Sequence, residues 1–323
     1  MGSNLKSFES FLNESKFSDK LVGNGEVGYT DYLTLEKPVL FLNFRYVGES
    51  INGEEYNVGD VIKKHFKSSE FCKFDNVHFF DGDVYCNTSK LNAYSLVFVG
   101  VTDDSYETYQ LIENYCKEKG VPFLSYGYPN YLNNKYLQMQ KLSSSGLKIP
   151  KTYTFNSKST CDISFVEKNF TYPLVIKPAH GSQGRGVEII KNRKEFQATL
   201  ESLKERFLMI QEFIPNDCDY RLFFIGGENI FSVKRTSSDK KEFRNNVSLG
   251  GTAEIIDIPI EQLTLGKRAH DCLNFYISGV DLVQNKKTKE WYVLEVNCAP
   301  QFNSFGHEET IKIFADKIKA IIK

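Results

Sequence analysis

The sequence contains no run of 18 consecutive apolar residues, so it predicts no transmembrane helix. Its N-terminus also lacks the basic stretch, apolar core and small-residue cleavage site of a secretory signal peptide. Histidine is scarce, with five residues, and none of them forms a metal-ligand pair at zinc-site spacing. We therefore expect neither a membrane protein nor a structural zinc protein.

Cysteine is present but shows none of the spacing of a disulfide or metal framework. The seven residues are scattered, odd in number and never arranged as CxxC. In a chain of 323 residues this usage is typical of reduced thiols in a cytosol. The prediction is a cytoplasmic protein with free thiols at Cys72, Cys86, Cys116, Cys161, Cys218, Cys272 and Cys298.

The chain carries almost no net charge, because 40 lysines and arginines balance 41 aspartates and glutamates. Nucleic-acid binding requires a strongly basic face, so this balance disfavours a nucleic-acid partner and leaves only a local patch open. The 26 phenylalanines and 18 tyrosines are enough for sizeable cores. A length of 323 residues suits two or three packed modules, and homo-oligomerisation is left open.

The first part of the chain changes its pattern at Pro38. Residues 1–36 are polar and weakly patterned, apart from apolar residues between Leu5 and Leu12 that fit a short amphipathic helix. From Pro38 onwards, short apolar runs of strand length alternate with helical patterns, one of which ends at Gly120. This alternation predicts a parallel, doubly wound sheet over residues 38–128, with strands in PVLFLNF, NVHFF, AYSLVFVGV and GVPFLSYG.

The later part begins with a helix expected over residues 131–146, which Gly146 ends. Two strands, PLVIK and GVEII, then flank a Gly-rich loop, and KNRKEFQATLESLKERF forms an amphipathic helix. Strands are expected in FLMIQEFI, YRLFFIGG, NIFSVKR and AEIIDI, followed by a helix over 261–276, a hairpin, and a last helix over 308–322. We accordingly divide the chain into residues 1–36, 37–129, 130–208 and 209–323.

The Gly-rich loop runs from His180 to Gly186 and follows Lys177, which stands in an apolar strand. Three glycines in six residues allow close backbone approach to phosphate oxygens, although a flexible hairpin tip has the same composition. The order G-x-x-G-x-G and the strand that follows argue against a Rossmann dinucleotide site. The missing Gly-Lys-Ser/Thr ending argues against a P-loop. A lysine charge in an apolar strand is costly unless it meets an anion, so Lys177 favours the phosphate interpretation.

A second feature is the hairpin that carries Asp281, Glu295 and Asn297. Glu295 and Asn297 are two residues apart on one strand and therefore share a face. Folding the hairpin about Thr288 places Asp281 opposite Glu295. Oxygen ligands of this kind suit Mg²⁺ that bridges nucleotide phosphates. The alternative is a polar hairpin surface, which the alternating apolar residues disfavour.

Two further sets of polar residues carry less weight alone. The first could equally be a strand and turn with an exposed acid, and it comprises Gln211, Glu212, Phe213 and Ile214, followed by Asp219 and Arg221. The second could equally be a solvated charged face, and it comprises Lys234, Arg235, Arg244, Asn246, Gly250 and Gly251. Cations close to a phosphoryl group stabilise the charge that builds up during its transfer.

Taken together and in this order, the motifs of residues 130–302 resemble the ATP-grasp superfamily, most closely its RimK-type glutamate ligases. The matching segments are the helix with Lys135, GLKIPKTYTF, VIKPAHGSQGRGVEII, QEFI, DYRLFFIGG, the KR pair, EFRNNVSLGG, GVDLV and LEVN. The resemblance implies an α/β protein with an ATP-grasp fold, in which two α+β subdomains clasp ATP after a Rossmann-like N-terminal domain. Residues 130–208 would form the small subdomain with the Gly-rich loop, and residues 209–323 the C-terminal subdomain with the Mg²⁺ site.

The resemblance also implies roles in ATP binding. Lys135 and Lys177 would hold the α- and β-phosphates. The loop that would close over the β- and γ-phosphates includes Gly181, Ser182, Gln183, Gly184, Arg185 and Gly186. Main-chain groups of Gln211, Glu212, Phe213 and Ile214 would read the adenine edge, and Asp219 would bind the ribose.

Catalytic and metal-binding roles follow in the same way. Arg235, Arg244 and Lys177 would act in catalysis, the two arginines by facing the γ-phosphate and the acyl phosphate. Substrate contacts would come from Arg221, Asn246, Gly250 and Gly251. Asp281, Glu295 and Asn297 would bind Mg²⁺, as two ions and with Mn²⁺ as a substitute.

The implied activity joins a small-molecule or peptide carboxylate to an amine through an acyl phosphate, and it releases ADP and phosphate. The product would be an amino acid attached to an amino acid, peptide or protein. A peptide macrocyclase, another modification enzyme and a non-catalytic nucleotide-binding module are the alternatives. One departure concerns the acceptor, because relatives read EVN-x-x-Pro-Gly whereas here Gln301 follows Pro300.

Overall fold

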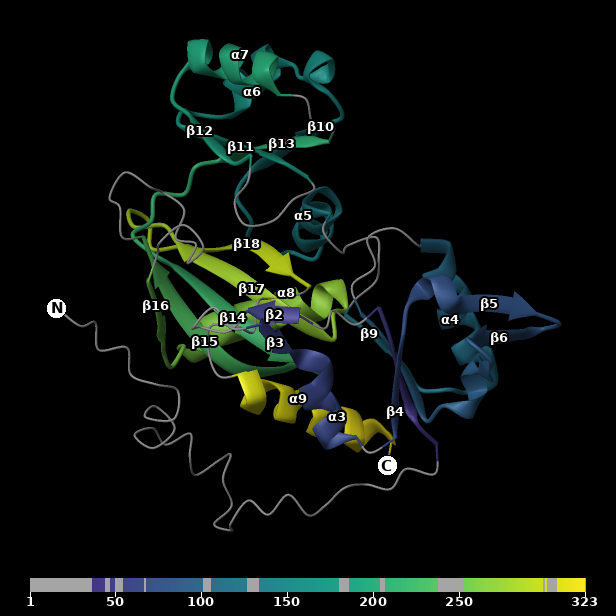
Figure 1. The fold of residues 1–323 in the computed structure, drawn as a ribbon. Coiled ribbons are helices and arrows are strands. Elements are labelled where there is room, and N and C mark those ends of the chain that lie inside the picture. Colours follow the sequence, from purple (N-terminus) through teal and green to yellow (C-terminus); the bar gives the residue numbers. More distant parts are fainter. Residues whose placement is uncertain are drawn as a thin grey trace. The chain divides into compact units, whose positions relative to one another are not determined.

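The computed structural model describes residues 37–43, 47–49, 55–66, 68–100, 106–126, 134–179, 186–203, 207–237, 252–298, 300 and 307–322. They form two compact units (Figure 1). Unit 1 contains the described residues of Met1–Gly100, Gln110–Phe123 and Gln301–Lys323, and unit 2 those of Val101–Tyr109 and Leu124–Pro300. The amphipathic helix expected near Leu5 lies outside the described residues.

Unit 1 is built on a four-stranded sheet of order β4-β1-β8-β9. β1 (Val39–Leu42) pairs in parallel with both β4 (Ser69–Cys72) and β8 (Leu96–Val99). All four side chains of β1 and all four of β8 are buried, which explains their continuous apolar runs. β9 (Phe123–Ser125) completes the sheet. The parallel pairing expected here is confirmed for β1 and β8, β4 is a strand that the sequence analysis did not predict, and a Rossmann-like classification of the unit stays a prediction.

The helices of unit 1 follow the expected stop signals. α4 (Tyr106–Lys119) ends at Gly120, whose φ of +68° lies in the left-handed region that glycine enters without strain. α3 (Val58–His65) packs against α9 (His307–Ile322). The ring of Phe314 meets Phe98 edge-on at 5.1 Å between centroids. α9 therefore groups with unit 1, although the sequence analysis assigned it with residues 209–323.

The remaining strands of unit 1 form small antiparallel sheets. β2 (Val47–Glu49) pairs with β3 (Glu55–Asn57), and β5 (Val77–Phe80) pairs with β6 (Asp83–Cys86), which pairs with β7 (Ser89–Lys90). Short 3-10 helices cover Phe74–Asn76 and Leu91–Ala93. The segment NVHFF is a strand as expected, but its assignment to the parallel sheet is wrong. The position beside β1 is taken by β4, and the Phe79 and Phe80 side chains of β5 are exposed.

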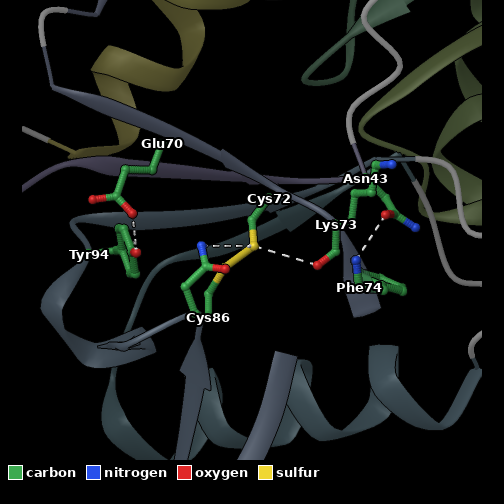
Figure 2. The surroundings of a disulfide bond; sticks show 8 residues. Asn43, Glu70, Cys72, Lys73, Phe74, Cys86 and Tyr94 are labelled. Carbon is green, nitrogen blue, oxygen red and sulfur yellow. Dashed lines mark hydrogen bonds between the residues drawn. A yellow bond between two sulfur atoms is a disulfide. The ribbon is translucent and has the colours of Figure 1, made fainter. Parts of the chain in front are cut away.

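Two cysteines of unit 1 form a disulfide bond, which corrects the prediction that all seven are reduced thiols. Cys72 ends β4 and Cys86 ends β6, so the bond joins the parallel sheet to the antiparallel one (Figure 2). Nearby, the Asn43 side chain accepts from the Phe74 amide at 3.1 Å. The sequence carried no CxxC signal, because the two cysteines are 14 residues apart and meet only through tertiary packing. Five further cysteines of the described chain are not in a disulfide bond: Cys116, Cys161, Cys218, Cys272 and Cys298.

Unit 2 begins with α5 (Lys135–Ser144), which the Asn134 side chain caps and Gly146 follows at a φ of +71°. A four-stranded antiparallel sheet of order β10-β13-β11-β12 comes next, covered by α6 (Ile163–Asn169) and α7 (Arg193–Ser202) (Figure 1). Its strands are β10 (Thr152–Phe155), β11 (Leu174–Pro178), β12 (Glu188–Ile190) and β13 (Leu208–Glu212), with a 3-10 helix at Lys158–Thr160. We call it the small sheet.

A five-stranded antiparallel sheet of order β16-β15-β14-β17-β18 forms the rest of unit 2, and we call it the large sheet. Its strands are β14 (Asp219–Ile225), β15 (Glu228–Thr236), β16 (Thr252–Ile255), β17 (Ile277–Gln284) and β18 (Trp291–Asn297). α8 (Ile260–Leu273) packs closely on β14, because a Cβ at Gly266 would lie 2.6 Å from Leu222.

One hydrophobic core of unit 2 joins α5, the small sheet, the large sheet and α8, and a second lies between the small sheet and the helices α6 and α7. Met139 of α5, Met209 of the small sheet, Leu222 of the large sheet and Leu273 of α8 all belong to the first. This shared core holds α5 and the two sheets against one another. Within the described chain, no helix is long and apolar enough to cross a membrane.

Candidate functional site

The polar hairpin of β17 and β18 has the predicted register at its polar residues. Asp281 pairs with Glu295, and Gly279 pairs with Asn297. Beyond Asp281 the register shifts by one residue, so that Leu282 pairs with Val293 and Leu294 forms a bulge. Bulges re-aim side chains and are common next to active sites. The prediction that Asp281 lies opposite Glu295 is confirmed.

Asp281, Glu295 and Asn297 offer the oxygen donors that a magnesium ion requires. The amide nitrogen of Asn297 lies 3.4 Å from Asp281 Oδ2 and 3.4 Å from the Gly279 carbonyl, so its amide oxygen points away from both. Among the described residues no three His, Cys, Asp or Glu side chains gather as a metal cluster. Two carboxylates and one amide nevertheless fit Mg²⁺, which keeps few protein ligands and takes others from water and phosphate.

Four charged residues form a buried network on the large sheet. Arg221 donates from Nε and Nη2 to the two oxygens of Asp281, at 2.6 and 2.7 Å. Arg235 donates from Nε to Asp219 Oδ1 at 2.6 Å and lies 3.1 Å from Asp281 Oδ2. Burial alone would raise the pKa of Asp281, but the two guanidinium groups lower it below the ordinary value. Asp281 is therefore an ionised carboxylate held by two cations.

Gly279 provides the space that the Arg221 side chain occupies. A Cβ at this position would lie 3.2 Å from Arg221 Cδ and 2.9 Å from the Cβ of Pro300. Gly279 pairs with Phe223 and Arg221 with Asp281, so the two residues are diagonal neighbours across β14 and β17, and a side chain at Gly279 would press on the Arg221 stem. The glycine thus serves the Arg221–Asp281 contact.

Two lysines, Lys177 and Lys135, lie near the hairpin of β17 and β18. Lys177 lies in β11 with 8% of its surface exposed. Burial is the largest cause that lowers its pKa, to about 8; Glu295 and Asp281 act against this effect and Lys135 reinforces it. Lys135 begins α5, and its Nζ lies 3.8 Å from Glu295 Oε2. The small sheet, α5 and the large sheet therefore place cations and carboxylates together.

A residue that the sequence analysis missed holds α5 against β18. Gln138 has 3% of its surface exposed, and its Oε1 lies 3.4 Å from the amide nitrogen of Val296, the residue between Glu295 and Asn297. This contact fixes the turn of helix that carries Lys135 relative to β18. A polar residue on the buried face of α5, at i+3 from Lys135, was the available signal.

The segment Gln211–Ile214 spans the end of β13, with Gln211 and Glu212 inside the strand. The Gln211 side chain is buried and donates to Thr152 Oγ1 at 2.8 Å. The Glu212 carboxylate accepts from the Lys151 amide at 2.8 Å, and the Ile214 carbonyl accepts from Asn216 at 2.8 Å. These contacts order the strand end, and the proposed adenine contacts of the segment, Phe213 included, stay a prediction.

Several predicted residues lie outside the described residues: Gly181, Ser182, Gln183, Gly184, Arg185, Arg244, Asn246, Gly250, Gly251 and Gln301. Gly186 is described and ends the Gly-rich loop with a φ of +70°. A Cβ there would lie 3.2 Å from Pro178 Cδ, and the positive φ is strained for other residues, so this position requires glycine. Lys135, Lys177, Asp281, Glu295, Arg221 and Arg235 are brought together by the contacts above.

The chain matches a known family and known ligases. Residues 132–322 match the family described as the RimK-like ATP-grasp domain. A "Probable alpha-L-glutamate ligase" from Histophilus somni is 30% identical over 213 residues, covering 65% of this chain and 68% of the relative. One of the same description from Vibrio atlanticus is 31% identical over 194 residues, covering 59% and 63%.

Solved structures of ATP-grasp ligases share the fold. The ATP-grasp ligase PsnB complexed with a minimal precursor superposes with a TM-score of 0.64 at 15% identity, covering 90% of this chain and 100% of PsnB. The VanG D-Ala:D-Ser ligase of Enterococcus faecalis superposes with a TM-score of 0.62 at 16% identity, covering 89% and 99%. At these identities the likeness shows the fold, which is the ATP-grasp fold expected.

Proposed function

Because the chain belongs to the RimK-like ATP-grasp family, we propose that it is an ATP-dependent carboxylate–amine ligase that works through an acyl phosphate. The enzyme class, an ATP-grasp ligase that forms C–N bonds, follows from the family and its relatives. The proposal for this chain rests on one observation: the cations Lys177 and Lys135 lie close to the carboxylates of Asp281 and Glu295. Cations and carboxylates in one buried place suit a polyphosphate with its metal ion.

Mg²⁺ would be held by Asp281, Glu295 and Asn297, as two ions and with Mn²⁺ as a substitute. The ion would neutralise the charge of the β- and γ-phosphates. A relative in fold, PsnB, has been solved with Mg and ADP. The donor set on β17 and β18 and its register support the assignment.

ATP would lie between the two sheets of unit 2. Lys135 and Lys177 would hold the α- and β-phosphates, and the loop of Gly181, Ser182, Gln183, Gly184, Arg185 and Gly186 would close over the β- and γ-phosphates. Main-chain groups of Gln211, Glu212, Phe213 and Ile214 would read adenine. A ribose contact of Asp219 would use its second oxygen, since Oδ1 accepts from Arg235.

The reaction has two steps. A carboxylate oxygen attacks the γ-phosphorus and the bond to the β-phosphate oxygen breaks, which gives an acyl phosphate and ADP. A neutral amine then attacks the acyl carbon, phosphate leaves with its bonding electron pair, and the amine nitrogen loses a proton. Phosphorylation is needed because oxide is a poor leaving group, and the protein contributes position and charge neutralisation.

The cations of the large sheet would stabilise the transferred group. Arg235 and Arg244 would face the γ-phosphate and the acyl phosphate, together with Lys177. Arg221, Asn246, Gly250 and Gly251 would contact substrate. Exclusion of water by the Gly-rich loop would protect the acyl phosphate from hydrolysis.

The carboxylate and amine would be an amino acid and an amino acid, peptide or protein. Relatives described as alpha-L-glutamate ligases support glutamate as the first acid to test. A peptide substrate, as in macrocyclisation, is the second candidate. Neighbours in fold include a Chryseobacterium gregarium RiPP-associated ligase solved with a leader and core peptide. A cytoplasmic location fits the use of ATP and stays a prediction.

The test is ADP release with mass spectrometry of the product. The enzyme is incubated with ATP, Mg²⁺ and pairs drawn from amino acids and short peptides, with and without hydroxylamine. We expect ADP only when both an acid and a nucleophile are present, and a hydroxamate when hydroxylamine replaces the amine. ADP formation with no condensed product, or full turnover in Asp281→Asn, would overturn the proposal.

A further inference from the structure

The four charged residues of the network on the large sheet balance one another. Arg221 lies opposite Asp281 across β14 and β17, and Asp219 lies opposite Arg235 across β14 and β15. The four residues carry two positive and two negative charges. A buried group of this kind is stable only when every charge has a partner, and here each one has.

The carboxylate of Asp281 already has several donors. Its two oxygens offer about four lone-pair positions. Three are taken by Arg221 and Arg235 nitrogens at 2.6, 2.7 and 3.1 Å, and the side-chain amide nitrogen of Asn297 lies 3.4 Å from Oδ2. A metal ion at this carboxylate would compete with these donors for its oxygens.

Arg221 is the donor that can leave. Arg235 is anchored a second time by Asp219 and has 6% of its side-chain surface exposed, whereas the guanidinium of Arg221 is hydrogen-bonded to Asp281 and its side chain is 17% exposed. The Arg221 stem passes close to Gly279, where an added Cβ would lie 3.2 Å from Arg221 Cδ. Departure of Arg221 would therefore break the Arg221–Asp281 ion pair and leave the Arg235–Asp219 pair intact.

We propose that Arg221 acts as a resident cation on Asp281 and is displaced when a divalent cation arrives with a nucleotide. This inference rests on the proposed function, because it takes Asp281 as a metal ligand. A metal ion alone would meet two guanidinium groups and the two lysines Lys135 and Lys177. A nucleotide brings the negative charge that makes the exchange favourable. Metal and nucleotide binding are thereby coupled, and Arg221 is a positioning residue of that coupling.

The experiment measures binding of Mn²⁺ by electron paramagnetic resonance, with and without ADP and independently of turnover. Wild-type protein is expected to bind Mn²⁺ alone weakly and about ten-fold more tightly with ADP. Arg221→Gln should bind Mn²⁺ alone about ten-fold more tightly than wild type, and its dependence on ADP should shrink. The matched control is Arg193→Gln, which removes an exposed arginine paired with Glu167 and should change neither value.

A second variant covers the case in which Arg221→Gln does not fold. Gly279→Ala keeps all four charges but displaces the Arg221 stem, so it should tighten Mn²⁺ binding in the absence of ADP by a smaller factor. Unchanged or weaker binding of Mn²⁺ alone in the folded variants would overturn the inference. Asp281→Asn separates the two claims: loss of Mn²⁺ binding supports the metal site whatever the arginine variants show. Retained binding would sink the metal assignment itself.

Discussion

The two units of the molecule treat buried charge in opposite ways. In unit 1 the strands β1 and β8 bury only apolar side chains, and a disulfide joins two of its sheets. In unit 2 the described residues include four buried ionisable side chains at the proposed site, namely Lys177, Asp219, Arg235 and Asp281. Buried charges cost stability unless they are paired, so their concentration in one unit marks the place where binding is worth that cost.

The first prediction concerns the loss of one charge from the network of buried ion pairs in unit 2. Arg235→Met leaves Asp219 buried beside Asp281 without its guanidinium partner, so the free energy of unfolding should fall by about 3–5 kcal/mol. Urea unfolding followed by circular dichroism measures it. The control Arg193→Met removes a pair whose arginine is 56% exposed and should cost at most about 1 kcal/mol. Equal costs for the two variants would remove the contrast between the units.

The second prediction uses His270, which lies in α8 and shares a hydrogen bond of 2.8 Å with Ser278 of β17. Burial is the main cause that lowers its pKa from 6.5 to about 4; Asp271 opposes this and Lys267 adds to it. Between these pH values the unfolded chain binds more protons than the folded chain. Stability should therefore fall as the pH drops from 6.5 to 4, by about 3 kcal/mol in total. His270→Gln should flatten this part of the pH profile, and an unchanged profile would show that His270 is not its cause.

The third prediction concerns the disulfide bond of unit 1. The Cys72–Cys86 bond closes a segment with a sequence separation of 14, and its removal should lower the free energy of unfolding by about 2 kcal/mol. Dithiothreitol should destabilise the wild type by this amount and leave a Cys72→Ala, Cys86→Ala double variant unaffected. Alkylation of both thiols in the folded, oxidised protein would show that the bond does not form.

The fourth prediction separates function from stability at Lys177. Its lowered pKa shows that the fold bears a cost for the buried ammonium. Lys177→Met should therefore raise the free energy of unfolding by about 1–2 kcal/mol at pH 7, while ADP binding weakens roughly ten-fold or more. Thermal unfolding and calorimetric titration measure the two effects, with the exposed Lys191→Met as the control. A variant that loses stability, or that binds ADP normally, would contradict this account of the lysine.

Local patterns in the sequence were sufficient for much of the fold. The helices α4, α5, α7, α8 and α9 appear where their periodicity and stop residues place them. The sequence also predicted one tertiary contact, because folding the hairpin about Thr288 places Asp281 opposite Glu295. The predicted register holds at Asp281 and Gly279, whereas the pairs nearer the turn are shifted by one residue because Leu294 forms a bulge.

The tertiary structure alone decided the partners that are distant in sequence. The Arg221–Asp281 contact spans 60 residues, and Gln138 reaches Val296 across 158. The pairing of Cys72 with Cys86 and the place of α9 in unit 1 also left no local signal. The physical reason is that periodicity encodes which side of an element is buried but not which neighbour covers it. The sequence by itself therefore predicted many of the elements and most of the proposed site residues. Only packing decided that the arginines and carboxylates of the large sheet neutralise one another.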